Sequence, residues 1–388
     1  MSRFYSYLNT AKGIIANYQG EMPLNIHLKQ FFTQEKKYGS KDRKQIAALC
    51  FPYYRASKAL TCNNIDDKIL YSYFLCENKS SALLAFFKPD LDEKIALPLN
   101  EKILLLNDVL KEEILFPFEN ELSETIHFSA FNTSILTQPK LYIRTRPLKN
   151  KLIENTLIEN NISFNTIHSN TFSLDNGTQI PDTLVPDQDY VVQDVSSQRV
   201  INVIEKYISE LPQNATVWDC CAASGGKSLM LYDARPDLYF TVSDVRESIL
   251  VNLKERFNKA GLKKYSKFVL DLNSMHGEKP SQKFDVVLAD VPCTGSGTWA
   301  RTPEQQYFFN EEQIQKFVKI QQKITLNASK FVKPKGYLVY ITCSVFKAEN
   351  EDNVTFLQEN GFELLDQQYN LGYTENADTL FVAVLKKV

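Results

Sequence analysis

The second half of the chain alternates between short apolar runs and longer amphipathic stretches, and this pattern constrains the fold most. From about residue 191 onward, five apolar runs suit the strands of a buried parallel sheet. They are TVWDC (216–220), YFTVSD (239–244), KFVL (267–270), FDVVLAD (284–290) and GYLVYITC (336–343). Helical stretches such as 247–261 and 310–332 separate them, and 334–336 is predicted to be a turn. The alternation predicts a doubly wound α/β domain over 191–388.

The first 190 residues show two other sequence patterns. Residues 1–130 place apolar side chains at three- and four-residue spacing, which is typical of helices. Five prolines, at positions 23, 52, 89, 98 and 117, are expected to divide this region into the helices of a bundle. Residues 131–190 contain a strand pattern at 141–146, a short helical stretch at 152–161 and an Asp-Asn-Gly turn signal at 175–177. We therefore predict a helical domain (1–130), a small α/β module (131–190) and the α/β domain (191–388).

The charge of the chain is balanced overall but uneven locally. Its 388 residues include 44 basic and 46 acidic ones, a formal net charge of −2, which excludes a uniformly basic coat for nucleic acid. Residues 29–58 carry eight basic side chains against two acidic ones, with Tyr38, Tyr53 and Tyr54 interleaved for base stacking. Residues 140–151 carry five basic side chains and no acid. The stretches favour a nucleic-acid partner, and the alternative for the first is a solvated helix face.

Nothing in the sequence indicates a membrane span or a metal site. No run of about 18 apolar residues occurs, and the N-terminus lacks the apolar core of a signal peptide, so a cytoplasmic protein is expected. The seven cysteines form no Cys-x-x-Cys pair, and the four histidines are scattered. Most of these thiols are expected to be small buried apolar groups.

A loop of small residues follows the first strand of the α/β domain. Small side chains let a ligand approach the backbone, and the helix that follows offers free N–H groups. A phosphate-binding P-loop would need glycine where Cys221 stands, so the loop is predicted to hold a polar cofactor of another kind. The alternative is a tight structural turn. The loop consists of Cys221, Ala222, Ala223, Ser224, Gly225, Gly226 and Lys227.

Two acids end the next two strands of the domain. Asp244 ends the second strand and Asp271 the third, where a carboxylate can accept hydrogen bonds from ribose hydroxyls. Each acid alone could equally be a helix cap or a loop residue. Together, after a loop of small residues, they favour a nucleoside-binding site.

Two cysteines follow the last two predicted strands. Cys293 comes just after Asp290, which ends the fourth strand, and Cys343 ends the fifth. Open α/β sheets build their sites at the carboxyl ends of the strands. Two thiols at adjacent strand ends therefore indicate thiol chemistry.

The motifs that carry these residues resemble those of a known family. DCCAASGGKS (219–228), DVPCTGSGT (290–298) and YITCSVFKAENE (340–351) are similar to motifs of the Sun (Nop/Sun) family of RNA cytosine-5 methyltransferases, as are VQDVSSQ (192–198) and WARTPE (299–304). The resemblance covers about 131–388. YGSKDRKQIAALCFPYYR (38–55) resembles the NusB-like RNA-binding domain of the bacterial ribosomal RNA members. Ser224 departs from the family's usual proline and Arg146 from its usual asparagine.

The resemblance implies a Rossmann-like domain that binds S-adenosylmethionine and methylates carbon 5 of a cytosine in RNA. It implies that Cys343 is the nucleophile, that Cys293 assists its release, and that Asp290 and Lys227 organise the base pocket. The implied cofactor residues are the loop 221–227 together with Asp244, Asp271 and Asp290. Small-subunit ribosomal RNA is the expected substrate, the 131–190 module is expected to contact RNA, and the protein is expected to be a monomer without a metal. The alternatives are a transfer RNA methyltransferase and a non-catalytic RNA-binding assembly factor.

Overall fold

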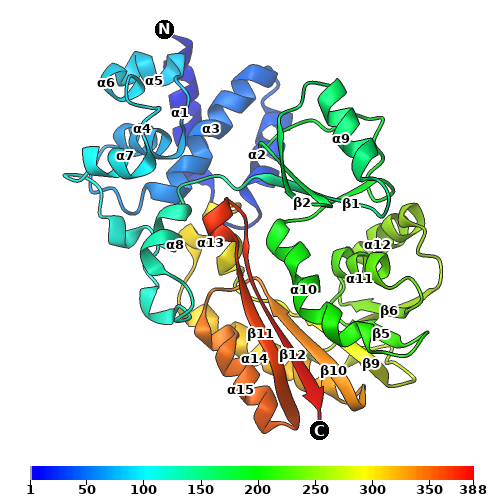
Figure 1. Cartoon of the computed structure of the whole chain (residues 1–388). Helices are drawn as coiled ribbons and strands as arrows, with labels where there is room; N and C mark the ends of the chain where they lie inside the picture. Colours follow the sequence, from blue (N-terminus) through cyan, green and yellow to red (C-terminus); the bar gives the residue numbers. More distant parts are fainter. Residues whose placement is uncertain (1) are drawn as a thin grey trace. The chain divides into compact units, whose positions relative to one another are not determined.

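The computed structural model describes residues 2–388, which fall into two compact units (Figure 1). The helical unit comprises the described residues up to Asn120, His127–Gln138 and Thr298–Asn310. The sheet unit comprises Glu121–Ile126, Pro139–Gly297 and Glu311–Val388. The predicted fold class is confirmed: an N-terminal helical bundle, a small α/β element and a C-terminal Rossmann-like domain. The domain boundaries at 130 and 190 stay a prediction.

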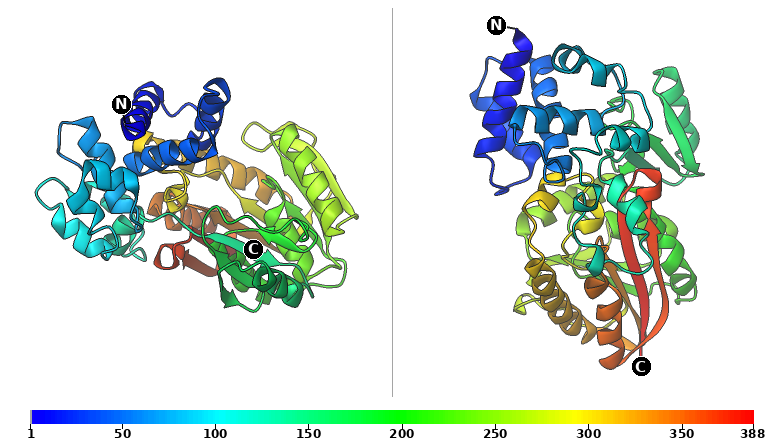
Figure 2. Two further views of the ribbon diagram at one scale, coloured as in Figure 1. Left: turned by 90° about the horizontal axis from the view of Figure 1, so that it is seen from above. Right: turned by 90° about the vertical axis from the view of Figure 1, so that its left-hand side faces the viewer.

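The helical unit, blue to cyan in Figure 2, is built around three helices that pack on one another. They are α1 (Arg3–Asn17), α3 (Ser40–Ala56) and α4 (Ile65–Cys76). The shorter helices are α2 (Leu24–Gln34), α5 (Ala82–Phe87), α6 (Pro89–Asp92), α7 (Leu99–Leu105), α8 (Phe128–Ser134) and α13 (Pro303–Phe308). The side chain of Asn64 accepts a hydrogen bond from the backbone N–H of Asp66 at 3.0 Å and so caps the start of α4. The helical periodicity of the sequence thus becomes one buried apolar core.

The prolines mark the helix starts at three of the five predicted positions. Pro23 and Pro98 cap α2 and α7, and Pro89 opens α6. Pro52 does not break the chain, because it lies inside α3 and is buried. The tertiary packing of α3 outweighs the local cost of a proline in a helix interior.

A segment distant in sequence completes the helical unit. The chain leaves the sheet unit after Gly297, forms α13 against α3, and returns at Glu311. Trp299 in this segment is only 1% exposed, and its ring lies 5.8 Å from that of Phe116. The WARTPE motif therefore folds with the N-terminal helices.

Two of the three interleaved tyrosines of the first basic stretch are buried and not available for stacking on bases. Tyr54 is 4% exposed and packs against the rings of Tyr18 and Tyr307. Tyr38 is also buried and shares a hydrogen bond with Thr10, and Tyr53 packs edge-on against Tyr54. For Tyr38 and Tyr54 that part of the prediction is wrong, because their rings belong to the core of the helical unit. For the half-buried Tyr53 it stays a prediction.

The large sheet of the sheet unit has eight strands in the order β11-β12-β10-β9-β5-β6-β7-β8. Its parallel strands are β5 (Thr216–Asp219), β6 (Tyr239–Asp244), β7 (Tyr265–Asp271), β9 (Phe284–Asp290) and β10 (Val332–Thr342). The antiparallel strands are β8 (His276–Gly277), β11 (Phe362–Leu371) and β12 (Thr379–Lys387). All five predicted strands are present, whereas β11 was not foreseen.

Helices cover both faces of this sheet, as Figure 1 shows for α10 on one side and for α14 and α15 on the other. The first face packs on α10 (Val195–Ser209), α11 (Gly226–Ala234) and α12 (Glu247–Ala260). The second packs on α14 (Glu312–Ser329) and α15 (Glu351–Glu359). Because both faces are covered, the strands read as continuous apolar runs.

One predicted turn is a bulge instead. Residues 334–336 lie inside β10, where the pairing with β9 shifts between Val332 and Tyr337. Lys335 has φ of +62°, and the bulge absorbs the extra residues without ending the strand.

A small antiparallel sheet in the order β2-β3-β1-β4 completes the sheet unit. Its strands are β1 (Leu141–Thr145), β2 (Phe164–His168), β3 (Thr171–Leu174) and β4 (Tyr190–Val192). Helix α9 (Asn150–Glu159) packs on it through Ile153 and Leu157. The predicted strand, short helix and turn of this region are all present.

Candidate active site

The two predicted thiols lie together at one edge of the large sheet. Cys293 follows β9 and Cys343 follows β10, and these strands are adjacent and parallel, with Ile341 opposite Asp290. The two Sγ atoms are 3.3 Å apart, within the distance of an S–H···S hydrogen bond. Both side chains are half-buried.

The two thiols differ in their surroundings. The hydrogen bond to Cys343, burial, and the charges of Cys343 and Glu349 raise the pKa of the Cys293 thiol well above its ordinary value. The protonated form of Cys293 is therefore favoured. It can donate that proton in a hydrogen bond to Cys343.

An ion pair stands beside the thiols. Lys227, in the first turn of α11, lies with its Nζ 2.5 Å from an Oδ of Asp290 at the end of β9. Burial alone would lower the pKa of Lys227, but the charge and hydrogen bond of Asp290 and the charges of Cys343 and Asp219 raise it above its usual value. The site thus contains a persistent cation next to Cys343.

A buried carboxylate ties the two thiol-bearing loops together. Glu349 is fully buried, and its Oε1 accepts hydrogen bonds from the backbone N–H of Thr294 at 2.9 Å and from Gln321 at 2.7 Å. Its Oε2 accepts from the hydroxyls of Thr294 and Ser344. Because Thr294 and Ser344 adjoin Cys293 and Cys343, one side chain fixes both loops. The sequence motif 340–351 contains Glu349, but no role was predicted for this residue.

The predicted cofactor loop joins β5 to α11. Ala223 has φ of +46° and Gly225 of +79°, and Gly225 precedes the first turn of α11. A Cβ on Gly225 would lie 2.5 Å from the ring of Phe257, so only glycine fits there. The hydroxyl and carbonyl oxygens of Ser224 accept hydrogen bonds from Arg256, at 2.7 and 2.9 Å. The turn is both sharp and anchored.

The two strand-end acids behave differently. The carboxylate of Asp244 is buried and accepts hydrogen bonds from the backbone N–H of Ala223 at 3.0 Å and from Arg246. It therefore belongs to the cofactor loop. Asp271 accepts hydrogen bonds from the backbone of Asn273 and the hydroxyl of Ser274, within its own loop. These bonds lower the pKa of Asp271.

A further acid that sequence reasoning left out of the site lies under the loop. Asp219 ends β5, is 1% exposed, and accepts one hydrogen bond from the hydroxyl of Ser228 at 2.7 Å. Its other oxygen has no hydrogen-bond partner within residues 2–388. Burial raises the pKa of Asp219 to about 7. The signal for it in the sequence was its position at the end of the strand that precedes the small-residue loop.

The basic residues of the 131–190 region are mostly neutralised. Arg144 and Arg146 contact Asp233, Lys140 lies 3.5 Å from Asp175, and Lys149 lies 2.8 Å from Asp189. The predicted contact of this module with RNA stays a prediction.

Within residues 2–388, no three His, Cys, Asp or Glu side chains are grouped so that they could hold a metal ion. No helix in the same range is both long and apolar enough to cross a membrane.

The doubly wound sheet, the small-residue loop at its first crossover and the polar groups at its strand ends define a Rossmann-like domain. Residues 207–385 match the family model described as 16S rRNA methyltransferase RsmB/F. Over this range the chain is similar to the methyltransferase domain of that family.

Curated proteins show the same sequence similarity. The chain is 31% identical over 211 residues to ribosomal RNA small subunit methyltransferase B of Salmonella arizonae, which covers 50% of this chain and 46% of that protein. It is 29% identical over 212 residues to the protein of the same name from Serratia proteamaculans, 51% of this chain and 47% of that one. The chain thus matches about half the length of these curated relatives.

Solved structures share the fold. The crystal structure of PH0851 superposes with a TM-score of 0.67 at 19% identity, over 94% of each chain. The structure of NSun6 from Pyrococcus horikoshii with SFG gives a TM-score of 0.58 at 17% identity, over 71% of this chain and 96% of that one. The family supports the expectation that S-adenosylmethionine is the cofactor.

Proposed function

We infer that the protein transfers a methyl group from S-adenosylmethionine to carbon 5 of a cytosine in RNA, with small-subunit ribosomal RNA as the substrate. The observation that carries this proposal is the pair of thiols 3.3 Å apart, beside the Lys227–Asp290 ion pair. Carbon 5 of cytosine is a weak nucleophile until a group adds at carbon 6, and a thiolate is the side chain suited to that addition.

The residues of the loop suit the cofactor. The first N–H groups of α11 can bind the cofactor's carboxylate, because no side chain caps this helix. The loop 221–226 leaves room close to the backbone, and Asp244 is the candidate for the ribose hydroxyls, with Asp271 and Asp290 flanking the site. When bound, the cofactor supplies an electrophilic methyl group.

Cys343 is the proposed nucleophile. The ammonium group of Lys227 and the Sγ of Cys293 lie beside it. Attack on carbon 6 forms the S–C bond and moves electron density to carbon 5, which can then accept the methyl group. The target base must leave its stack to reach the carboxyl ends of β9 and β10.

Asp290 and Lys227 are proposed to face the polar edge of the base. Asp290 would accept a hydrogen bond from the amino group, while Lys227 offsets the negative charge that develops on the ring. Their ion pair fixes both side chains in advance of binding.

Cys293 is the proposed base for release. The hydrogen bond and charge of Cys343 are among the causes of its raised pKa, and both disappear once Cys343 is bonded to carbon 6. Cys293 can then lose its own proton to solvent, and the resulting thiolate takes the proton on carbon 5. The electrons of that C–H bond re-form the ring double bond and expel the Cys343 thiolate. The contact between the two thiols therefore favours protonated Cys293 before the attack, and its loss favours deprotonation of Cys293 afterwards.

Bisulfite sequencing of small-subunit ribosomal RNA and transfer RNA tests the substrate, in cells with the gene, without it, and with the Cys343→Ala variant. We expect one protected cytosine in the ribosomal RNA that vanishes in the second and third cells. Protection lost from a transfer RNA instead would favour the first alternative. No change in any RNA would leave the assembly factor as the better description.

A further inference from the structure

An arginine that the proposed mechanism does not use is bonded to the cofactor loop. Arg256 lies on α12, and its Nη1 donates to both oxygens of Ser224, the hydroxyl at 2.7 Å and the carbonyl at 2.9 Å. Its Nε and Nη2 lie 2.9 and 2.8 Å from one carboxylate oxygen of Asp187. All three guanidinium nitrogens therefore contact protein oxygens, which suits Arg256 to holding the loop in place and not to binding a ligand.

Ser224 occupies the most strained part of the loop. It lies between Ala223, with φ of +46°, and Gly225, with φ of +79°, so the backbone is left-handed on both sides of it. This conformation is costly for alanine and persists only where surrounding contacts hold it. The family's usual proline at position 224 would restrain φ through its ring, whereas serine leaves φ free. The hydrogen bonds from Arg256 can supply the missing restraint.

The other contacts of the loop show where it is held already. The backbone N–H of Ala223 donates to Asp244 at 3.0 Å, and Asp244 is the candidate for binding the ribose hydroxyls. Phe257, the neighbour of Arg256 on α12, closes the space beside Gly225. The turn is thus held by the proposed ribose acid on one side and by α12 on the other.

Asp187 fixes the direction of the long Arg256 side chain. Asp187 lies between β3 and β4, has φ of +66°, and its backbone N–H donates to the carbonyl of Tyr190 at 2.7 Å. The side chains of Arg256 and Asp187 are 21% and 13% exposed, so water screens this ion pair less than a pair on the open surface. A partner at the far end of a flexible side chain reduces the number of rotamers that the side chain samples.

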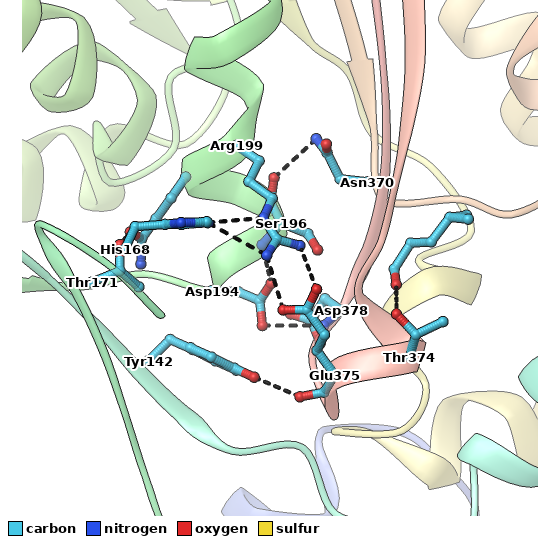
Figure 3. Close-up of polar contacts among 12 residues, drawn as sticks. Tyr142, His168, Thr171, Asp194, Ser196, Arg199, Asn370, Thr374, Glu375 and Asp378 are labelled. Atoms are coloured by element: carbon cyan, nitrogen blue, oxygen red, sulfur yellow. Dashed lines mark hydrogen bonds and ion pairs between the residues drawn. The ribbon is translucent and has the colours of Figure 1, made fainter. Parts of the chain in front are cut away.

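The ion pair also joins the small antiparallel sheet to the cofactor loop, because Asp187 precedes β4, which pairs with β1. Figure 3 shows a different attachment of the same small sheet. There the hydroxyl of Tyr142 donates to the backbone carbonyl of Glu375 at 2.6 Å. Arg199 on α10 bonds the carboxylate of Glu375 at 2.9 and 3.1 Å and contacts His168 at 3.4 Å. Arg199 is therefore an arginine of the same kind with other partners.

We propose that Arg256 is a positioning residue of the cofactor site, which holds the loop 221–227 in its binding conformation through Ser224 and is oriented by Asp187. The proposal rests on the proposed function, because S-adenosylmethionine is the ligand that this loop is inferred to bind. The small sheet then contributes to cofactor affinity through Asp187 and Arg256.

Hydrogen exchange of the full chain without ligand tests the positioning role directly. Arg256→Met removes the guanidinium group and keeps an unbranched apolar side chain on α12. We expect the amides of residues 222–226 to exchange about tenfold faster in this variant, because the loop opens more readily. Arg199→Met is the matched control, since Arg199 is 19% exposed and pairs with Glu375. Unchanged exchange of the loop in Arg256→Met would overturn the proposal.

Calorimetry with S-adenosylmethionine and steady-state kinetics test the effect on the site. We expect Arg256→Met to bind the cofactor about tenfold more weakly and to raise its KM, with kcat at saturating cofactor unchanged. A loss of folded protein alone would lower kcat and leave KM as it is. Asp187→Asn keeps an acceptor for Arg256 and should show a smaller change in the same direction.

A second substitution tests how Arg256 acts. Adding Ser224→Pro to Arg256→Met should recover most of the affinity, because the proline ring restrains the backbone that the arginine no longer holds. A double variant as weak as Arg256→Met would contradict this account of its action.

The proposed function and the role of Arg256 can fail separately. A wild-type chain that does not bind S-adenosylmethionine would contradict the proposed function, and the exchange of residues 222–226 would still decide the role of Arg256. Equal cofactor affinity of wild type and Arg256→Met would overturn the positioning role and leave the proposed function standing.

Discussion

At the scale of single residues, the proposed chemistry depends on two thiols that touch but differ. Cys293 keeps its proton because Cys343, burial and Glu349 raise its pKa, while Cys343 lies next to the cation of Lys227. If the two cysteines were only structural, replacing either one would have the same effect on the reaction with RNA. A reacting pair would give two different failures.

We therefore predict that Cys293→Ala forms the carbon-6 adduct and then stalls with RNA attached, whereas Cys343→Ala forms no adduct. The double variant should behave like Cys343→Ala, because release cannot matter where attack never occurs. Denaturing gels after incubation with RNA and S-adenosylmethionine would reveal the adduct as a band of raised mass. Cys62→Ala, in the helical unit, is the control. An adduct in Cys343→Ala alone would reverse the two roles.

The second residue-scale prediction concerns Asp219. Burial raises its folded pKa to about 7, above its unfolded value, so folding favours the protonated carboxyl. Between the two pKa values the native state binds more protons than the unfolded state, and stability falls as pH rises, by roughly 1 kcal/mol per pH unit. Asp219→Asn should lose this component and be more stable than wild type at pH 8. Thermal denaturation from pH 5 to pH 8 measures the difference, and parallel curves for the two proteins would contradict it.

At the scale of elements, the site is made by loops that follow parallel strands. Strands β9 and β10 end side by side and deliver Asp290, Cys293 and Cys343 to one edge, and the start of α11 delivers Lys227. The carboxylate of Glu349 then joins the loop of Cys293 to that of Cys343. Sheet pairing alone would leave these loops free to separate.

We predict that Glu349→Ala slows disulfide formation between Cys293 and Cys343 by diamide about tenfold or more. The variant should also lose about 3 kcal/mol of stability, because several buried donors become unpaired. Glu349→Gln, which keeps one acceptor and the size, should recover most of the cross-linking rate. Glu351→Ala is the control, since Glu351 bonds Ser123 and Tyr369 instead of the thiol loops. Equal rates in wild type and Glu349→Ala would show that the loops need no such link.

At the scale of the whole molecule, the two units are not two consecutive stretches of sequence. Thr298–Asn310 comes from between the strands of the large sheet yet belongs to the core of the helical unit. Each unit contains one fully buried tryptophan, Trp299 in the helical unit and Trp218 in the sheet unit. Replacing each tryptophan in turn tests whether the two units have separate cores.

We predict that Trp299→Ala destabilises the helical unit by about 3–5 kcal/mol, the usual cost of emptying an aromatic site in a core. Hydrogen exchange should accelerate in α3 and α13 and stay unchanged in β5 and β9. Trp218→Ala should give the opposite pattern. Accelerated exchange in the large sheet of the Trp299 variant would mean that the insertion belongs to the other core.

The sequence by itself determined the α/β domain and the strand ends that its candidate site occupies. Buried parallel strands must be continuous apolar runs, so 216–220, 239–244 and 284–290 were readable in one dimension. The carboxyl ends of parallel strands share one edge, so Asp290, Cys293 and Cys343 could be brought together before any coordinates.

Only the tertiary structure decided which polar groups meet and which aromatic rings are buried. Pro52 continues a helix, 334–336 is a bulge, and Tyr38 and Tyr54 belong to a core, because packing outweighs local preference in each case. The bonds of Glu349 and the shared acid of Arg144 and Arg146 join elements far apart in the chain. Periodicity reports which face of an element is buried, but the partner it meets there is a three-dimensional fact.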